Sequence, residues 1–149
     1  MTRSLPPKSL FLYADDDPDD RQLLMEIFSD YSASVELLTF PDALLLLEYL
    51  QSLQPLQPQP ALIILDQNMP GLTGINAIPY LRALSHIEEV PMVIFTTSSQ
   101  PHEAARARQL GAGFVTKPLT AAQVQQIVDQ LLDFCADDVK ERVNRMRGK

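Results

Sequence analysis

The chain has 149 residues, of which 46% are hydrophobic and 21% charged, and its formal net charge is -7. No apolar run approaches the roughly 20 residues that cross a bilayer, so a membrane-spanning protein is excluded. The surplus of acid argues against direct binding of nucleic acid, because phosphate contacts need clustered Lys and Arg.

The single cysteine, Cys135, cannot form a disulfide within the chain, and no Cys/His cluster has the spacing of metal ligands. Zinc and iron–sulfur chemistry are therefore excluded. The N-terminal segment MTRSLPPKSLFLYADDD has only a short apolar stretch before a block of acid, which is not the pattern of a signal peptide. We therefore expect a cytoplasmic protein.

Short apolar runs alternate with amphipathic segments along the chain, which is typical of an α/β fold, a parallel sheet with helices on both faces. We count five strands and five helices. The predicted strands cover residues 10–14, 34–40, 61–65, 91–96 and 112–116. The predicted helices cover residues 18–31, 41–53, 74–84 and 101–110, and a last helix carries Val124, Ile127, Val128, Leu131 and Leu132 at helical spacing.

Three segments qualify this pattern. Residues 54–60 hold three prolines in seven residues, which predicts a stiff surface loop. Pro79 lies inside a predicted helix and should kink it or shift its start. Leu44 to Leu47 point about 100° apart on a helix, so at least one should be exposed. These leucines either pack against the loop of 54–60 or contact another subunit or partner.

Polar residues follow the predicted strands, at the edge of a parallel sheet where function collects. Alone, the run DDDPDD is typical of a solvated helix N-terminus. Here further polar groups accompany it. The residues at this edge are Asp15, Asp16 and Asp17 after the first strand, Asp66 after the third, Thr96 and Thr97 at the end of the fourth, and Lys117 before Pro118 after the fifth.

Carboxylates that converge on one cleft raise one another's pKa values unless a cation lies among them. Because only oxygen ligands are available, we expect Mg²⁺, with Mn²⁺ as a substitute. An Asp carboxylate can attack phosphorus when a metal and a lysine offset the incoming charge, which fits Asp66 and Lys117. The Thr96 hydroxyl would donate to a phosphoryl oxygen.

Four segments, in order, resemble the receiver domain of bacterial response regulators, the family of the chemotaxis protein CheY. They are FLYADDDPDD, LIILDQNMPGLTG, PMVIFTTSS and GAGFVTKP. The resemblance implies a receiver domain over residues 10–134, with an N-terminal tail of 1–9 and a basic helical extension or tail of 135–149. It also implies a doubly wound, flavodoxin-like sheet with strand order 2-1-3-4-5. The chain looks most like single-domain regulators of bacteria related to Cytophaga.

The resemblance also implies roles for single residues. Asp16 would hold the metal directly and Asp15 largely through water, with Asp66 and the main-chain carbonyl of Asn68 as further ligands. Asp66 would accept the phosphoryl group, and Lys117 would pair with Asp66 and then with its phosphate. Thr96 and Phe114 would be the switch residues. The Lys117–Pro118 bond is often cis in such domains.

The sequence departs from the family pattern at three positions. Thr73 stands where the family often has Asp, Pro79 is unusual inside its helix, and Asp17 adds a third acid to the pair. None of these removes a required group. A basic cluster near the C-terminus is either a solvated helical face or a docking element for an acidic partner; it comprises Lys140, Arg142, Arg145, Arg147 and Lys149.

We therefore predict a phosphoacceptor of two-component signalling, not an enzyme, which takes its phosphoryl group from a histidine kinase or histidine phosphotransfer protein. The signal would pass through a protein surface to an unknown downstream protein. The sequence is also compatible with a homodimer. His86 and His102 are interpreted as solvated and not as phosphodonors.

The site residues also bear on three alternative functions. A pseudo-receiver would act only as a protein-binding module, and the intact set of site residues argues against it. An aspartate-nucleophile phosphohydrolase needs an acid two residues after the nucleophile, where Asn68 stands. A flavin-binding domain needs a phosphate loop after the first strand, where the acids at 15–17 would repel the phosphate.

Overall fold

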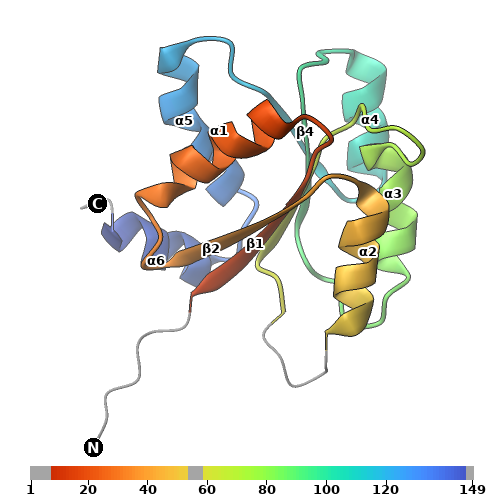
Figure 1. The fold of residues 1–149 in the computed structure, drawn as a ribbon, viewed down its shortest axis with the longest axis horizontal. Coiled ribbons are helices and arrows are strands. Elements are labelled where there is room, and N and C mark those ends of the chain that lie inside the picture. The colour runs from red at the N-terminus through yellow and green to blue at the C-terminus, as the bar shows by residue number, and fades with distance from the viewer. Residues whose placement is uncertain (1–7, 54–58, 147–149) are drawn as a thin grey trace, which may run out of the picture.

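The computed structural model describes residues 8–53 and 59–146, whose five strands form one parallel sheet with helices on both sides (Figure 1). The strand order is β2-β1-β3-β4-β5, which confirms the predicted doubly wound topology. The strands are β1 (Ser9–Ala14), β2 (Val35–Phe40), β3 (Leu62–Leu65), β4 (Met92–Thr96) and β5 (Gly113–Thr116). The helices are α1 (Pro18–Ser29), α2 (Ala43–Ser52), α3 (Gly74–Arg82), α4 (Pro101–Gln109), α5 (Ala121–Leu132) and α6 (Asp137–Met146).

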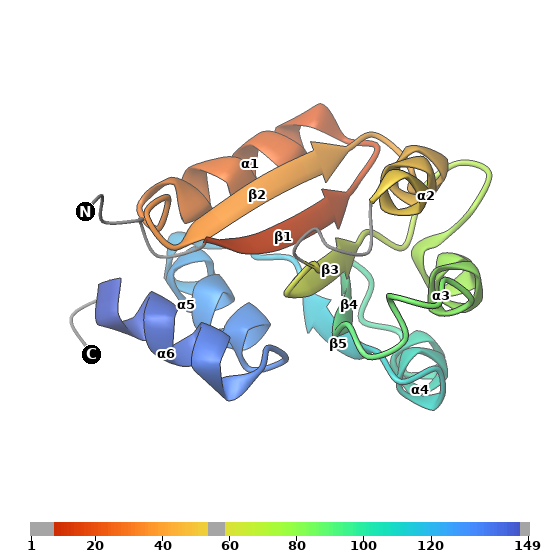
Figure 2. The same ribbon diagram turned by 90° about the horizontal axis from the view of Figure 1, so that it is seen from below.

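The core has two halves, because side chains alternate between the two faces of each strand. Leu12 of β1 lies opposite Ile63 of β3, and both pack in the half covered by α2, α3 and α4. Phe11 and Ile64 face the other half, with α1, α5 and α6. Figure 2 shows these two groups of helices on opposite sides of the sheet.

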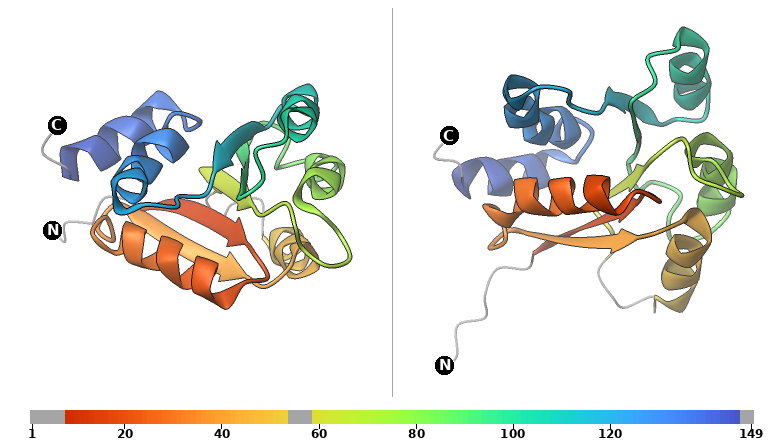
Figure 3. Two further views of the ribbon diagram at one scale, coloured as in Figure 1. Left: turned by 90° about the horizontal axis from the view of Figure 1, so that it is seen from above. Right: turned by 45° about the horizontal axis from the view of Figure 1, so that its top comes forward.

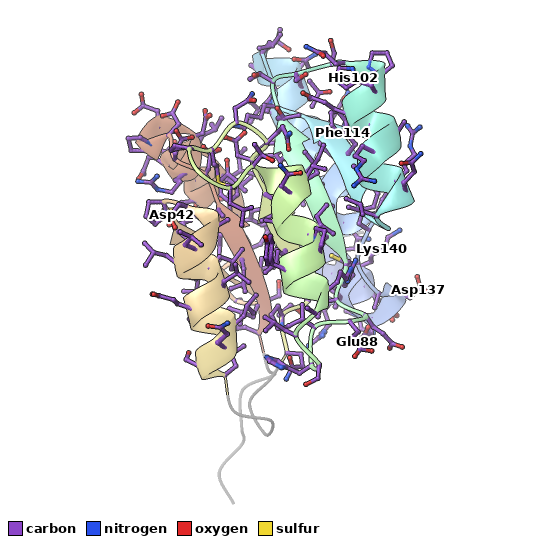
Figure 4. The ribbon with its side chains drawn as sticks, turned by 90° about the vertical axis from the view of Figure 1, so that its right-hand side faces the viewer. Asp42, Glu88, His102, Phe114, Asp137 and Lys140 are labelled. Atoms are coloured by element: carbon purple, nitrogen blue, oxygen red, sulfur yellow. The ribbon has the colours of Figure 1, made fainter. Side chains whose placement is uncertain are left out.

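Side chains satisfy free backbone N–H groups where several helices begin. The Asp17 carboxylate accepts from the N–H of Asp19 at 2.8 Å at the start of α1. The Asp42 carboxylate accepts from Leu45 at 2.8 Å at the start of α2, where Figure 4 labels it. Thr120 opens α5 with a capping box. Asp17, the extra acid of the sequence motif, is therefore the cap of α1.

The described residues contain six helices, one more than the five counted from the sequence, and the sixth lies within the segment 135–149 that was expected as a helical extension or tail. The additional helix, α6, lies next to α5 (Figure 3). Val139 and Val143 stand four residues apart on one face of α6 and are buried in the same half of the core as α5. Among the α6 residues whose burial the structure describes, these two are the buried apolar ones, and charged residues surround them in the sequence.

The basic cluster lies on this helix as far as the structure describes it. Lys140 pairs with Asp133 at 3.2 Å, Arg142 with Asp138 at 3.5 Å, and Arg145 with Glu141 at 3.2 Å. Each cation thus has an acidic neighbour, which favours the solvated-face interpretation. Arg147 and Lys149 lie outside the described residues.

The leucine run behaves as predicted. Leu44 and Leu45 are 62% and 42% exposed, whereas Leu46 is fully buried. The two interpretations of the exposed leucines both stay open, because residues 54–58 of the proline-rich loop lie outside the described part of the chain. Pro79 does not shift the start of α3, which begins at Gly74 as predicted. Among the described residues, no helix has the length and hydrophobicity that crossing a membrane requires.

We predict that α6 contributes to the stability of the whole domain. Val143→Ala removes two methyl groups from a fully buried position, so it should lower the free energy of unfolding by about 1–3 kcal/mol. Glu141→Ala is the matched control on the exposed face and should cost no more than about 0.5 kcal/mol. Urea denaturation measures both variants. Equal effects would contradict the packing of α6 on the core.

Candidate functional site

Three acids meet where β1 and β3 end. Asp15 and Asp16 follow the last residue of β1, and Asp66 follows the last residue of β3, which is the neighbouring strand. One carboxylate oxygen from each residue lies within 4.8 Å of the others. Asp15 and Asp66 are buried, and Asp16 is exposed. The structure therefore brings together the three acids that the sequence predicted as metal ligands.

Lys117 joins this group from the end of β5. Its Nζ lies 2.8 Å from Asp15 Oδ2 and 3.0 Å from Asp66 Oδ1, and the side chain is 8% exposed. A third carboxylate completes its surroundings, because Asp20 Oδ2 of α1 also lies 2.8 Å away. A lysine ammonium has three N–H donors, so these three acids can use all of them.

The carboxylate of Asp15 is engaged on both oxygens. Oδ1 accepts from the N–H of Asp17 at 2.9 Å, and Oδ2 accepts from both Lys117 and the Tyr13 hydroxyl. The backbone carbonyl of Asp15 accepts from Arg21 Nη1 at 2.6 Å. Asp15 thus accepts four hydrogen bonds, whereas Asp16 is exposed at the same edge of the sheet. This difference fits a direct metal contact for Asp16 and an indirect one for Asp15.

A close backbone approach shapes the loop after Asp66. A Cβ on Gly74 would lie 2.4 Å from the carbonyl oxygen of Asp66, so only glycine fits there without a shift. Gln67 ties the same loop to α3, because its side chain accepts from the N–H of Ile75 at 2.8 Å and its carbonyl from Gly74 at 3.2 Å. Thr73 caps α3 through Asn76 at 3.3 Å and so fills the position where the family often has Asp.

The other predicted residues surround this centre. Thr96 is fully buried, and its carbonyl accepts from the N–H of Lys117 at 2.7 Å. Asn68 is exposed, and within the described residues no hydrogen bond reaches its carbonyl. Phe114 is half-buried on β5, packed against the half of the core that α4 covers (Figure 4). The Lys117–Pro118 bond is trans, since no described peptide bond is cis.

Neither histidine belongs to the cluster of acids around Lys117. His102 is exposed near the start of α4, as predicted (Figure 4). His86 is half-buried and its Nε2 lies 3.0 Å from the carbonyl oxygen of Leu50, so its interpretation as a solvated residue was wrong.

Burial and neighbouring charges shift the pKa values of the central pair. Burial raises the pKa of Asp66, and the charges of Asp15 and Asp16 add to this effect, while Lys117 opposes it. Burial alone would lower the pKa of Lys117. The hydrogen bonds and charges of the surrounding acids outweigh burial and raise that pKa above its usual range. Lys117 is therefore a permanent cation at neutral pH.

The charge balance of the site fits a divalent cation. Asp15, Asp16, Asp20 and Asp66 are four acids, and Lys117 is the one cation that pairs with three of them. The pKa of Asp66 stays raised although Lys117 lowers it, so the lysine offsets only part of the cost of the buried charge. The carboxylate and carbonyl oxygens at this edge are ligands that Mg²⁺ and Mn²⁺ accept.

Sequence reasoning missed Tyr13, Asp20 and Arg21. Strand alternation places residue 13 on the same face as residue 15, which could have indicated the Tyr13–Asp15 contact. Asp20 follows Asp16 by four residues, which is helical spacing, so the acidic run itself carried a signal. Arg21 reaches a backbone carbonyl, and no sequence pattern indicates such a contact.

Comparison with known proteins identifies the class to which this fold and site belong. The family model described as "Response regulator receiver domain" matches residues 11–129, so the chain belongs to the receiver domain family of two-component response regulators. The recognition made from the four sequence segments is thereby confirmed.

Several individual response regulators are similar to this chain in sequence. It is 32% identical to the two-component response regulator ARR17 of Arabidopsis thaliana, over 82% of this chain and 84% of that protein. It is 26% identical to the response regulator Rcp1 of Synechocystis, over 91% and 94%. Chemotaxis protein CheY-3 of Vibrio cholerae is 29% identical over 48% of this chain. The chain spans about half the length of the first curated relatives it matches.

Solved structures show the same fold. The phosphorylated cyanobacterial phytochrome response regulator RcpA superimposes with a TM-score of 0.76 and 21% identity, over 89% of this chain and 96% of that one. The Mn²⁺-bound form of response regulator Rcp1 gives a TM-score of 0.72 and 24% identity, over 86% and 94%.

We predict that Asp66→Asn stabilises the chain in EDTA at pH 7, on the order of 1 kcal/mol, because it removes a buried charge that lies near two other acids. The raised pKa means that the folded state binds this proton more tightly than the unfolded state. The stability of the wild type relative to the variant should therefore fall as pH rises from 3.8 through the folded pKa, and then level off.

Urea denaturation across this pH range measures the difference between the two proteins. Asp19→Asn, which changes an exposed acid of the same run, should stay within about 0.5 kcal/mol of the wild type. Mg²⁺ should stabilise the wild type more than Asp66→Asn. A variant that is less stable than the wild type in EDTA would contradict the account of Asp66.

Proposed function

We propose that Asp66 is the phosphoacceptor of a two-component signalling pathway and that the chain signals through contacts with other proteins. The observation that carries this proposal is the meeting of Asp66 Oδ1 with Lys117 Nζ at 3.0 Å, next to two further acids that suit a metal. A buried carboxylate beside a fixed cation can act as a nucleophile toward phosphorus. Membership in the receiver family supports the same assignment.

The donor would be the phosphohistidine of a histidine kinase or a histidine phosphotransfer protein. A carboxylate oxygen of Asp66 forms the new O–P bond while the N–P bond of the phosphohistidine breaks, and the bonding electron pair stays on the ring nitrogen. Because the transition state is loose, positioning and charge neutralisation provide most of the acceleration. No group of the acceptor needs to donate a proton to the leaving imidazole.

The chain's own residues would each have one task in this transfer. Lys117 would hold a phosphoryl oxygen through its ammonium, and the buried hydroxyl of Thr96 would hold another. Asp16, Asp66 and the Asn68 carbonyl would hold Mg²⁺, with Asp15 acting through water. Bound there, Mg²⁺ would neutralise charge on the phosphoryl oxygens. Mn²⁺ is a suitable substitute because it accepts the same oxygen ligands.

Signalling would follow from movement of Thr96 toward the new phosphate and of Phe114 inward. Phe114 is half-buried, so an inward and an outward position are both compatible with its place on β5. The surface of α4, β5 and α5 would then shift between two populations, and a downstream protein would bind one of them.

We assign the receiver domain to residues 10–134, with 135–149 as its helical extension or tail, and we place the protein in the cytoplasm.

Incubation with Mg²⁺ and acetyl phosphate tests the phosphoacceptor directly. Intact-mass measurement should show one phosphoryl group on the wild type, which acid leaves in place and hydroxylamine removes. EDTA should abolish the adduct, because the site then lacks the charge that offsets the phosphoryl oxygens. Asp66→Ala should carry none, and Asp30→Ala, at the far end of α1, should behave like the wild type. Equal labelling of wild type and Asp66→Ala would refute the proposal.

A further inference from the structure

Asp20 forms an ion pair with Lys117, and the proposed phosphoacceptor function assigns no role to it. It lies in the first turn of α1, and its Oδ2 is 2.8 Å from Lys117 Nζ, the same distance as that of Asp15. The adjacent acid, Asp19, makes no ion pair within the described residues and is exposed. The contact therefore belongs to Asp20 in particular and not to the acidic run as a whole.

The ammonium of Lys117 has no donor to spare. Its three N–H groups face three acids, and each of these lies within 3.0 Å. In the proposed reaction Lys117 must donate to a phosphoryl oxygen on Asp66. The phosphoryl oxygen takes the donor that Asp66 Oδ1 now uses, and its larger negative charge draws the ammonium away from its other two partners, Asp15 and Asp20.

The surroundings of Asp15 and Asp20 determine which of these two contacts with Lys117 weakens more. The Asp15 side chain is fully buried and is also held by Tyr13 and by the N–H of Asp17. The contact with Asp66 is replaced by the contact with the phosphoryl group on the same residue. The Asp20 side chain is 32% exposed, so water can replace the ammonium as its partner at small cost.

We propose that Asp20 is a positioning residue that holds Lys117 in the unphosphorylated state and competes with the phosphoryl group for its ammonium. This inference rests on the proposed function of Asp66. Asp20 keeps Lys117 aimed at the cluster, but it also favours the unphosphorylated state, because its ion pair with Lys117 is weakened on phosphorylation. Replacing it should shift the balance toward the phosphorylated state.

Beryllofluoride, a mimic of the phosphoryl group, provides the equilibrium measurement. The chain has no tryptophan, so ¹⁹F NMR of the bound fluorines is a suitable signal. In excess Mg²⁺, Asp20→Asn should bind beryllofluoride about three-fold more tightly than the wild type, the size expected for a partly exposed ion pair. Asp19→Asn removes the same charge one residue away and should change the affinity by less than about 1.5-fold, through screened long-range repulsion alone.

A second measurement is made on the wild type, and the two variants serve only to assign its resonances. The ¹³C carboxyl resonance of Asp20 is assigned by its loss in Asp20→Asn, and that of Asp19 by its loss in Asp19→Asn. Addition of beryllofluoride should shift the Asp20 resonance toward that of a solvated carboxylate and leave the Asp19 resonance in place. A purely structural role for Asp20 would not produce this shift.

The outcomes separate this inference from the proposed function. If Asp20→Asn and Asp19→Asn bind beryllofluoride equally and the Asp20 resonance does not move, the competition is refuted while the phosphoacceptor stands. Weaker binding by Asp20→Asn also refutes the competition. If the wild type does not bind beryllofluoride in Mg²⁺, the proposed function itself fails.

Discussion

The rest of the site depends on one buried ammonium, that of Lys117, placed among three carboxylates. Without it, Asp15 and Asp66 would be two buried acids beside each other with no cation to offset their charges, and the pKa of Asp66 would rise further. The three acids that contact Lys117 come from different parts of the fold: Asp15 follows β1, Asp20 belongs to α1 and Asp66 follows β3. The parallel sheet makes this possible because all these elements present one end at the same edge. The ion pairs of Lys117 therefore depend on the strand order of the sheet and, in turn, hold the acids of the site together.

Much of the fold could be predicted from the sequence. The strands and the first five helices have strong patterns, because buried strands read as apolar runs and helices repeat their apolar residues at 3–4-residue spacing. Helix ends were less predictable: α1 ends at Ser29, before the predicted residue 31, where the N–H of Tyr31 bonds instead to the carbonyl of Phe28. α6 lies in the segment expected as a helical extension or tail and was not counted, because the burial of Val139 and Val143 against the core is a tertiary contact that the charged sequence around them does not indicate.

For the site, too, the sequence indicates the residue types but not the contacts that they make. The sequence indicated that Asp15, Asp16, Asp66 and Lys117 would lie together, because each follows a strand of a parallel sheet, and the structure brings them together. Their other partners could not be predicted, because a contact such as that of Asp20 with Lys117 joins residues 97 positions apart and depends on the final geometry. The comparisons establish the receiver family and its fold. The contact of Asp20 with Lys117 comes from the structure of this chain and not from the comparisons, and it is open to direct measurement.

The central claim is that Asp66, and no other acid of the cluster, accepts the phosphoryl group. Borohydride reduces an aspartyl phosphate to homoserine and leaves free carboxylates unchanged, so it records the modified position permanently. After treatment with acetyl phosphate and Mg²⁺, reduction and tandem mass spectrometry should find homoserine at position 66, with Asp15, Asp16 and Asp20 intact. Homoserine at one of those three positions, or at none, would contradict the account.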